Sequence, residues 1–268
     1  MTYDILGPGA LDYLPCHYGA SKLTFRGPRR KLKPPFVAFL GGTQTFGKFV
    51  AQPYPLRVEH LTGVTSVNLG QLNAGVDVFA RDEGVLKIAR AARVNVLEVV
   101  GAANMTNPFY TVHPRRNDRF LQASVQLRAQ YPEVDFSQFN FTQHMLNHLQ
   151  RADADRFAVL EKGLQRVWSR RMRQLVGKLG KNTVLLHFAT VGEGPCAGGP
   201  MFVTPQMIAT LGAQVAASVH VPVPPPDDAP DRGMVFNPVE REAARQLPGP
   251  DVHADAARLL RPVLDAMM

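Results

Sequence analysis

PFVAFLGGTQTFGK, residues 35–48, is the stretch of sequence that decides the fold. Its first part, 36–40, is apolar, aromatic or β-branched, and such a run predicts a buried strand. Two glycines, two threonines and a third glycine follow, which predicts a tight turn that opens a helix. Ligands of α/β proteins bind outside the carboxyl ends of strands, where this turn would lie. Thr43, within the turn, is therefore the first candidate site residue.

The same order of strand, polar turn and helix recurs along the chain. Five apolar runs are predicted to be strands, over residues 36–40, 65–69, 94–100, 183–189 and 215–221. The first three end in turns rich in glycine, asparagine or threonine, and this repetition predicts a parallel sheet with helical crossovers. We expect a single doubly wound, three-layer α/β domain over residues 1–268, with helices on both faces of a five-stranded sheet.

Two segments stand outside this repeat. Residues 1–34 are expected to form an irregular arm, because glycine and proline are frequent there. The basic cluster of this arm is interpreted as a solvated surface and comprises Lys22, Arg26, Arg29, Arg30, Lys31 and Lys33. Residues 108–150 are expected to form a helical insertion or lid, with one helix near 119–131 and another ending near 151.

Two amphipathic helices are expected in the second half of the chain. The first, over 155–177, has an apolar stripe opposite a face of arginine and lysine, which is typical of a helix packed on a core. The second is expected over about 254–267 and would be the last element of the domain.

The composition bounds the class of protein. The 30 Lys and Arg residues exceed the 22 Asp and Glu residues, and the net charge of +8 favours an anionic partner. Nucleic acid is not expected, because the basic residues are dispersed and form no nucleic-acid-binding motif. Since the sequence has neither a signal peptide nor a run of about 18 apolar residues, we expect a cytoplasmic protein without a membrane span. Whether the chain forms a homo-oligomer stays open.

The motifs predict neither a cofactor nor a metal. Cys16 and Cys196 are far apart and lack the spacing of metal ligands. The glycine-rich loop at 192–199 lacks the nucleotide-binding P-loop pattern, and no GxGxxG motif follows a strand. His144 and His148 are four residues apart but lack the glutamate of an HExxH zinc site.

The polar residues at the strand ends contain the ingredients of an acyl-transfer site, which needs a hydroxyl, a base with an acidic partner, and donors for an oxyanion. Thr43 supplies the hydroxyl, and His253 with Asp251 the acid–base pair. The candidate oxyanion donors are Gly70, Asn73, Gly75 and Asn104. Threonine and asparagine can also stand at these positions for purely structural reasons, since threonine caps helices and asparagine tolerates left-handed turns.

These motifs resemble the SGNH, or GDSL-like, hydrolase superfamily, whose four blocks occur in the same order. GGTQTFG at 41–47 is similar to the first block, with Thr43 where the family has its nucleophilic serine. VNLGQLNAG at 67–75 resembles the second block, and GAAN at 101–104 resembles the third. The resemblance implies a flavodoxin-like sheet and an esterase or acyltransferase, with Asn104 as the oxyanion-hole asparagine.

The fourth block, D-x-x-H, resembles Asp251 to His253, which implies His253 as general base and Asp251 as its partner. The chain departs from the blocks, since Thr43 replaces the serine, Gly42 and Met105 replace aspartates, and the fourth block is one residue short. A threonine hydroxyl is also a more crowded nucleophile than serine. More narrowly, LGGTQTFGKF, NAGVDVF and VHPRRNDRF resemble a bacterial protein family of undefined function over most of the chain.

A second polar cluster follows the third turn and is expected, together with Thr45, to bind the substrate. The cluster comprises His113, Arg115, Arg116, Asn117, Asp118 and Arg119. The substrate-binding residues expected within it are His113, Arg115, Arg116 and Arg119. Arginine recognises phosphate, sulfate or carboxylate with paired hydrogen bonds. The sequence therefore predicts an esterase or acyl-transferring enzyme acting on a polar or anionic small molecule or saccharide. Two alternatives stay open: a catalytically inactive protein that binds an anionic metabolite or saccharide, and a sulfuryl- or phosphoryl-group transferase.

Overall fold

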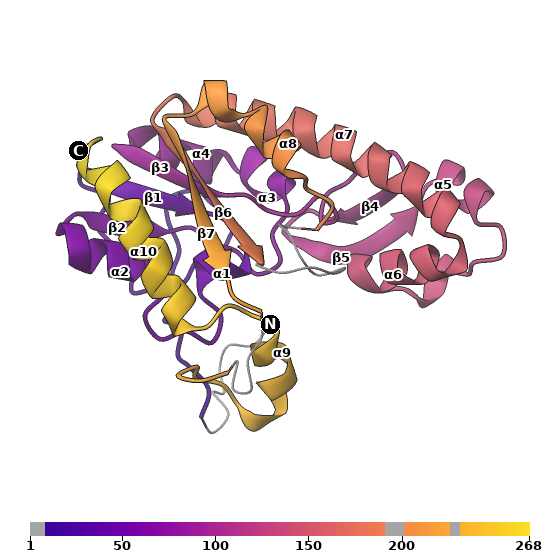
Figure 1. Ribbon diagram of the computed structural model, residues 1–268, viewed down its shortest axis with the longest axis horizontal. Coiled ribbons are helices and arrows are strands. Elements are labelled where there is room, and N and C mark those ends of the chain that lie inside the picture. The colour runs from indigo at the N-terminus through magenta and orange to yellow at the C-terminus, as the bar shows by residue number, and fades with distance from the viewer. Residues whose placement is uncertain (1–8, 191–200, 226–230) are drawn as a thin grey trace.

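The structure is a computed structural model that describes residues 9–190, 201–225 and 231–268. Five parallel strands form one sheet in the order β2-β1-β3-β6-β7 (Figure 1). The strands are β1 (Phe36–Leu40), β2 (Thr65–Asn68), β3 (Val94–Glu98), β6 (Thr183–Thr190) and β7 (Ala217–Val223). This order, with helices on both faces, confirms the predicted three-layer, flavodoxin-like fold.

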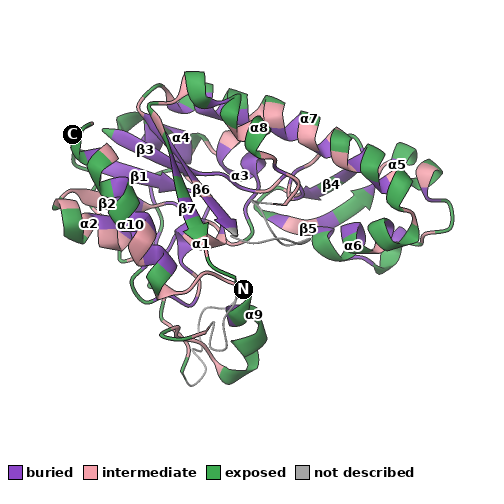
Figure 2. Cartoon of the chain, in the orientation of Figure 1, coloured by how far each residue is buried: buried purple, intermediate pink, exposed green. Residues whose placement is uncertain are grey.

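Alternate residues of each inner strand point into two separate cores. Val37 and Phe39 of β1 pack with helices α2 (Tyr54–Thr62) and α10 (Pro250–Asp265) on one face of the sheet. Phe36, Ala38 and Leu40 belong to the core on the other face, which α3, α4 and α7 cover. All five β1 side chains are buried, as expected for a central strand covered on both sides. Figure 2 shows that the inner strands are buried, whereas the outer surfaces of the helices are exposed.

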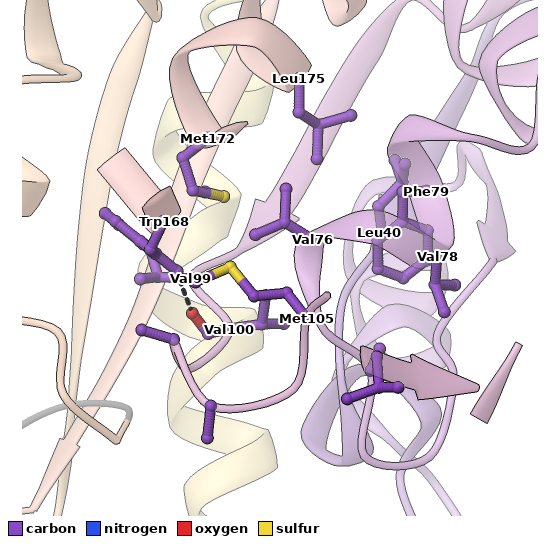
Figure 3. Close-up of a cluster of buried hydrophobic side chains, with 14 of the residues drawn as sticks. Leu40, Val76, Val78, Phe79, Val99, Val100, Met105, Trp168, Met172 and Leu175 are labelled. Carbon is purple, nitrogen blue, oxygen red and sulfur yellow. Dashed lines mark hydrogen bonds between the residues drawn. The ribbon is translucent and has the colours of Figure 1, made fainter. Parts of the chain in front are cut away.

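The helices of the second face are α3 (Val76–Ala80), α4 (Glu83–Ala91) and the long α7 (Ala154–Leu179). Trp168 of α7 is fully buried, and its indole Nε1 donates to the carbonyl of Val100, 2.8 Å away (Figure 3). Met105 lies in the same cluster and is also fully buried. The residue that stands in place of the third-block aspartate is therefore a core side chain.

The insertion differs from the predicted helical segment. Strands β4 (Tyr110–His113) and β5 (Arg116–Ala123) form an antiparallel hairpin, so the helix expected near 119–131 is wrong over its first part. Buried side chains of β5 recur at Asn117, Phe120 and Ala123, and this spacing of three imitates a helix. The register shifts beside Val112, and such a bulge disturbs the alternation of a regular strand.

Short helices complete the insertion, namely α5 (Val125–Gln130), η1 (Phe136–Gln138) and α6 (Thr142–Ala152). The other short elements are α1 (Thr43–Phe46), α8 (Pro205–Ala209), η2 (Gly212–Gln214), η3 (Pro238–Glu240) and α9 (Arg241–Arg245). The glycine-rich loop at 192–199 lies outside the described residues.

Helix α10 starts at Pro250, earlier than the expected 254, because proline is favourable in the first helical turn. Asp251 and His253 consequently lie in that first turn and not in a loop before the helix.

The described part of the N-terminal arm is irregular, as expected, but one member of its basic cluster is buried. The Arg26 side chain is only 7% exposed and donates to the carbonyls of four residues that follow the first turn. These acceptors are Phe46, Gly47, Val50 and Ala51. The interpretation of the whole cluster as solvated surface is therefore wrong for Arg26, because a guanidinium can satisfy several buried carbonyls at once.

Replacing Arg26 should destabilise the protein far more than replacing its neighbour Arg29, which is exposed. Arg26→Ala leaves buried carbonyls without donors, and we expect the free energy of unfolding to fall by about 2–4 kcal/mol. Arg29→Ala is the matched control and should change it by less than about 0.5 kcal/mol. Urea unfolding of the three proteins measures the difference, and equal midpoints would contradict this role of Arg26.

Candidate functional site

A cleft of about 1070 Å³ lies at the carboxyl edge of the sheet. The turns after β1, β2 and β3 contribute to its lining, as do α6 of the insertion and the segment that leads into α10. The predicted site residues that line it are Thr43, Asn73, Asn104 and Asp251. Three turns that are distant in sequence thus meet at one edge, as parallel strands require.

Thr43 and Asn73 form a reciprocal pair at this edge. The Thr43 hydroxyl donates to Asn73 Oδ1 at 3.2 Å and accepts from the Asn73 backbone N–H at 3.0 Å. Asn73 has φ 53°, a left-handed conformation that asparagine tolerates better than most residues. The Thr43 hydroxyl is therefore held by hydrogen bonds and has no basic side chain as a partner among the described residues.

Asn104 and the insertion extend this pair into a network. Asn104 Nδ2 donates to the Asn73 carbonyl at 2.9 Å, and its Oδ1 accepts from the Thr142 hydroxyl at 2.6 Å. Asn73 Nδ2 donates to Asp118 Oδ2 at 3.2 Å. Asp118 and Thr142 also line the cleft. Asp118 belongs to the polar cluster noted in the sequence, whereas Thr142 was not singled out. The insertion is thus bonded directly to the predicted site.

Gly70 and Gly75 serve close packing, and their N–H groups are occupied. A Cβ atom at Gly70 would lie 2.3 Å from the Phe46 nitrogen, and one at Gly75 would lie 1.5 Å from the Asn104 carbonyl oxygen. The Gly70 N–H donates to Asn68 Oδ1 at 2.9 Å, and the Gly75 N–H donates to Asn117 Oδ1 at 3.2 Å. In this geometry neither N–H points to a cleft ligand.

Glu98 is a buried cleft residue that the sequence analysis did not identify. It is the last residue of β3, it is 4% exposed, and it lines the cleft. Its Oε2 accepts from the N–H groups of Gly42 at 2.8 Å and Thr45 at 2.9 Å, and from the Thr45 hydroxyl. Burial raises the pKa of the Glu98 carboxyl to about 7, against the hydrogen bonds that favour its charged form.

Thr45 does not line the cleft, and its side chain is fully buried. Its hydroxyl contacts Glu98 and lies 2.7 Å from the hydroxyl of Tyr54. Thr45 thus supports Glu98 from within the protein.

The structure buries His253 against Tyr54. The ring is 1% exposed, and its Nδ1 accepts from the Tyr54 backbone N–H at 3.1 Å. It stacks on the Tyr54 ring, with centroids 5.9 Å apart. Burial, with Arg26 and Arg57 nearby, lowers the pKa of His253 to about 3. His253 does not line the cleft, whereas Asp251, two residues earlier, is exposed and does.

The predicted substrate-binding residues of the second polar cluster lie beside the cleft and do not line it, namely His113, Arg115, Arg116 and Arg119. His113 Nδ1 accepts from the backbone N–H groups of Arg115 and Arg116, which are both exposed, and thereby closes the β4–β5 turn. Arg119 stacks on the ring of Phe141 at 4.3 Å. The arginines that line the cleft are instead Arg232 and Arg245.

No group of three or more metal-ligating side chains occurs among residues 9–190, 201–225 and 231–268. In the same described residues, no helix is long and apolar enough to cross a membrane. What the cleft offers is hydrogen-bonding side chains, two arginines and three carboxyl groups, those of Glu98, Asp118 and Asp251.

The fold and the cleft define a three-layer α/β protein with a polar cleft at the carboxyl edge of its parallel sheet. The chain belongs to the family described as "Domain of unknown function (DUF6473)", whose model matches residues 1–268. This confirms the expected membership of a family without a defined function. No curated protein matches the chain.

Because the pKa of Glu98 is raised, we expect the free energy of unfolding to depend on pH. A carboxyl whose pKa rises from 4.5 to about 7 on folding stabilises the protein below pH 4.5, and this contribution is lost as the pH rises to 7. The loss amounts to about 3 kcal/mol. We expect Glu98→Gln to abolish this part of the pH dependence, because glutamine keeps an acceptor for Gly42 and Thr45 without ionising.

Urea unfolding between pH 5 and 8 compares the two proteins. Glu83→Gln is the matched control, since Glu83 is 75% exposed and should leave the wild-type profile unchanged. Identical profiles for wild type and Glu98→Gln would show that Glu98 does not change its protonation on folding.

Proposed function

We propose that this protein binds a small, hydroxyl-rich ligand, such as a saccharide or an acidic derivative of one, in the cleft at the carboxyl edge of the sheet. The observation that carries the proposal is the network of Thr43, Asn73 and Asn104, which brings three turns together and lines the cleft. In this proposal Thr43 positions Asn73 and does not attack the ligand, because its hydroxyl is engaged on both sides.

The lining of the cleft supports a hydroxyl-rich ligand. It contains six carboxamides, those of Gln44, Asn73, Asn104, Gln143, Asn147 and Gln246. A carboxamide offers both donors and acceptors, and a hydroxyl group needs one of each. Such a surface suits a ligand with many hydroxyls better than an apolar one.

The charges of the lining support an acidic group on that ligand. Arg232 and Arg245 are both exposed at the cleft, and arginine pairs with carboxylate or phosphate through two parallel hydrogen bonds. Arg245 Nε lies 3.8 Å from Asp231 Oδ2, which is beyond hydrogen-bond distance. This ion pair therefore leaves the Arg245 guanidinium able to bind a ligand as well. The net charge of +8 would also attract an anion to the protein.

Thermal shift and calorimetric titration with neutral sugars and uronic acids test the proposal. Asn147 of α6 lines the cleft with an exposed side chain, so Asn147→Ala should preserve the fold and weaken binding about tenfold by removing hydrogen bonds. Gln150→Ala is the matched control, since Gln150 is on the same helix and does not line the cleft. If no sugar binds, or if both variants bind equally, the proposal fails.

A second candidate is an SGNH-like esterase or acyltransferase with Thr43 as nucleophile. The observation that favours it is that Thr43, the second turn and Asn104 lie together, in the order of the resembled blocks. In this candidate His253 would act as the base, and its ring would first have to leave the Tyr54 N–H. Asp251 already lies at the cleft and would orient the base or the substrate.

Hydrolysis of short-chain nitrophenyl esters and transfer from an acyl-donor panel separate the two candidates. If Thr43 is the nucleophile, Thr43→Ala should lower turnover at least a hundredfold, while Thr43→Ser should keep or raise it because serine is less crowded. His253→Ala should lose activity as well. Turnover that is equal in wild type, Thr43→Ala and His253→Ala would remove both residues from catalysis.

A further inference from the structure

The two carboxyl oxygens of Glu98 have different surroundings. Oε2 is saturated, since it accepts two backbone N–H groups and the Thr45 hydroxyl. Oε1 makes no hydrogen bond with the described residues, although Glu98 lines the cleft. One oxygen therefore fixes the carboxyl in place, and the other is left for a molecule in the cleft.

Two glycines make room for this carboxyl. A Cβ atom at Gly41 would lie 2.4 Å from Oε2, and one at Gly42 would lie 3.2 Å from Oε1. Gly42 itself lines the cleft and has φ −84°, which any residue can adopt. A side chain at position 41 would therefore occupy the space that the Glu98 carboxyl takes. A side chain at position 42 would cover Oε1, which Gly42 leaves open to the cleft.

Hydrogen bonds on the buried side of the Glu98 carboxyl run in one direction, from Tyr54 to Thr45 and from Thr45 to Glu98. The Thr45 hydroxyl has a single proton, which it gives to Glu98 Oε2, so it must accept its second bond from the Tyr54 hydroxyl. Tyr54 is fully buried, which raises its pKa well above the ordinary value, and it remains a donor. The interior therefore stabilises Glu98 without exchanging protons with it, and exchange is left to Oε1.

We propose that Glu98 is the proton-exchanging group of the cleft, and that its Oε1 takes a proton from a ligand hydroxyl or gives one to a ligand oxygen. When the proton leaves a hydroxyl, the electron pair of the O–H bond stays on the ligand oxygen and the carboxylate becomes neutral. The reverse step restores both groups. This inference rests on the proposed function, because the reacting oxygen belongs to the ligand of that cleft.

The charge balance near Glu98 suits this exchange. Because burial raises the pKa of Glu98 to about 7, both protonation states are populated near neutral pH. Tyr54 faces it from α2 through Thr45. The other ionisable side chains that line the cleft are Asp118, His144, Arg232, Arg245 and Asp251. A neutral Glu98 can donate to a carbonyl or carboxylate oxygen, and an ionised one can accept from a hydroxyl.

An α-aryl diazoacetamide tests this exchange, because it esterifies only protonated carboxyl groups. The diazo carbon takes the carboxyl proton, dinitrogen leaves, and a carboxylate oxygen bonds to that carbon. Peptide mass spectrometry measures the modified fraction of Glu98 at pH 6 and pH 8.5. From a pKa of about 7, the protonated fraction and hence the labelling rate should be about thirtyfold higher at pH 6.

Two variants make the test specific. Glu98→Gln should lose the label at this position. Gly42→Ala should reduce labelling of Glu98 at least threefold, because the new methyl group would lie against Oε1. Gly177→Ala is the matched control, since a Cβ atom there meets nothing within 4 Å, and it should label as wild type. Circular dichroism and thermal unfolding confirm that each variant is folded.

Failure of this inference is distinguishable from failure of the proposed function. Labelling is measured without any sugar, so it reports on Glu98 whatever the titrations show. No modification of Glu98 at pH 6 while Asp118 or Asp251 reacts, or equal modification at both pH values, would overturn the inference. For any sugar that binds, wild-type affinity should change at least threefold between pH 6 and 8.5, and Glu98→Gln should remove this change. A wild-type affinity independent of pH would also overturn it.

Discussion

The bonds from Glu98 to the first turn are the interaction on which this edge of the sheet depends. They join the end of β3 to the backbone of the β1–α1 turn, through the N–H groups of Gly42 and Thr45. Without this acceptor, two buried N–H groups would be left unpaired, which is costly. The position of Thr43, and through it that of Asn73, follows from how this turn is fixed.

The neighbouring turns depend on close contact between backbones. The second turn approaches the first at Gly70 and the third at Gly75, where no side chain would fit. Since these turns are so close, the Asn104 side chain bonds to the Asn73 carbonyl, and the Asn73 side chain bonds to Thr43 and Asp118. The polar network of the cleft is thus a consequence of glycine at a few turn positions.

The sheet was predictable from the sequence because its central strands are buried on both faces and therefore appear as uninterrupted apolar runs, as in 36–40. The hairpin of the insertion was not, since Asn117, Phe120 and Ala123 repeat at a helical interval. The gathering of Thr43, Asn73 and Asn104 followed from parallel topology alone. Glu98 was missed because a single acidic residue at the end of an apolar strand has no motif around it.

The position of His253 shows a different limit of prediction from the sequence. Its sequence neighbourhood indicates a loop before a helix, yet the helix begins at Pro250 and turns the ring toward the Tyr54 N–H. Residues two apart on a helix point in different directions, so Asp251 lines the cleft while His253 is buried in the core. Arg26 shows the same limit, because only three-dimensional contacts identify which member of a basic cluster is buried.

The bonds from the insertion to the floor of the cleft have a consequence for molecular recognition. Asp118 and Thr142 are bonded to Asn73 and Asn104, so this wall of the cleft is held together by hydrogen bonds within the protein. A ligand of the proposed kind would therefore lose little affinity to the entropy of ordering loops at this wall. Such a preorganised wall would also favour proposed ligands that match its shape over those that do not.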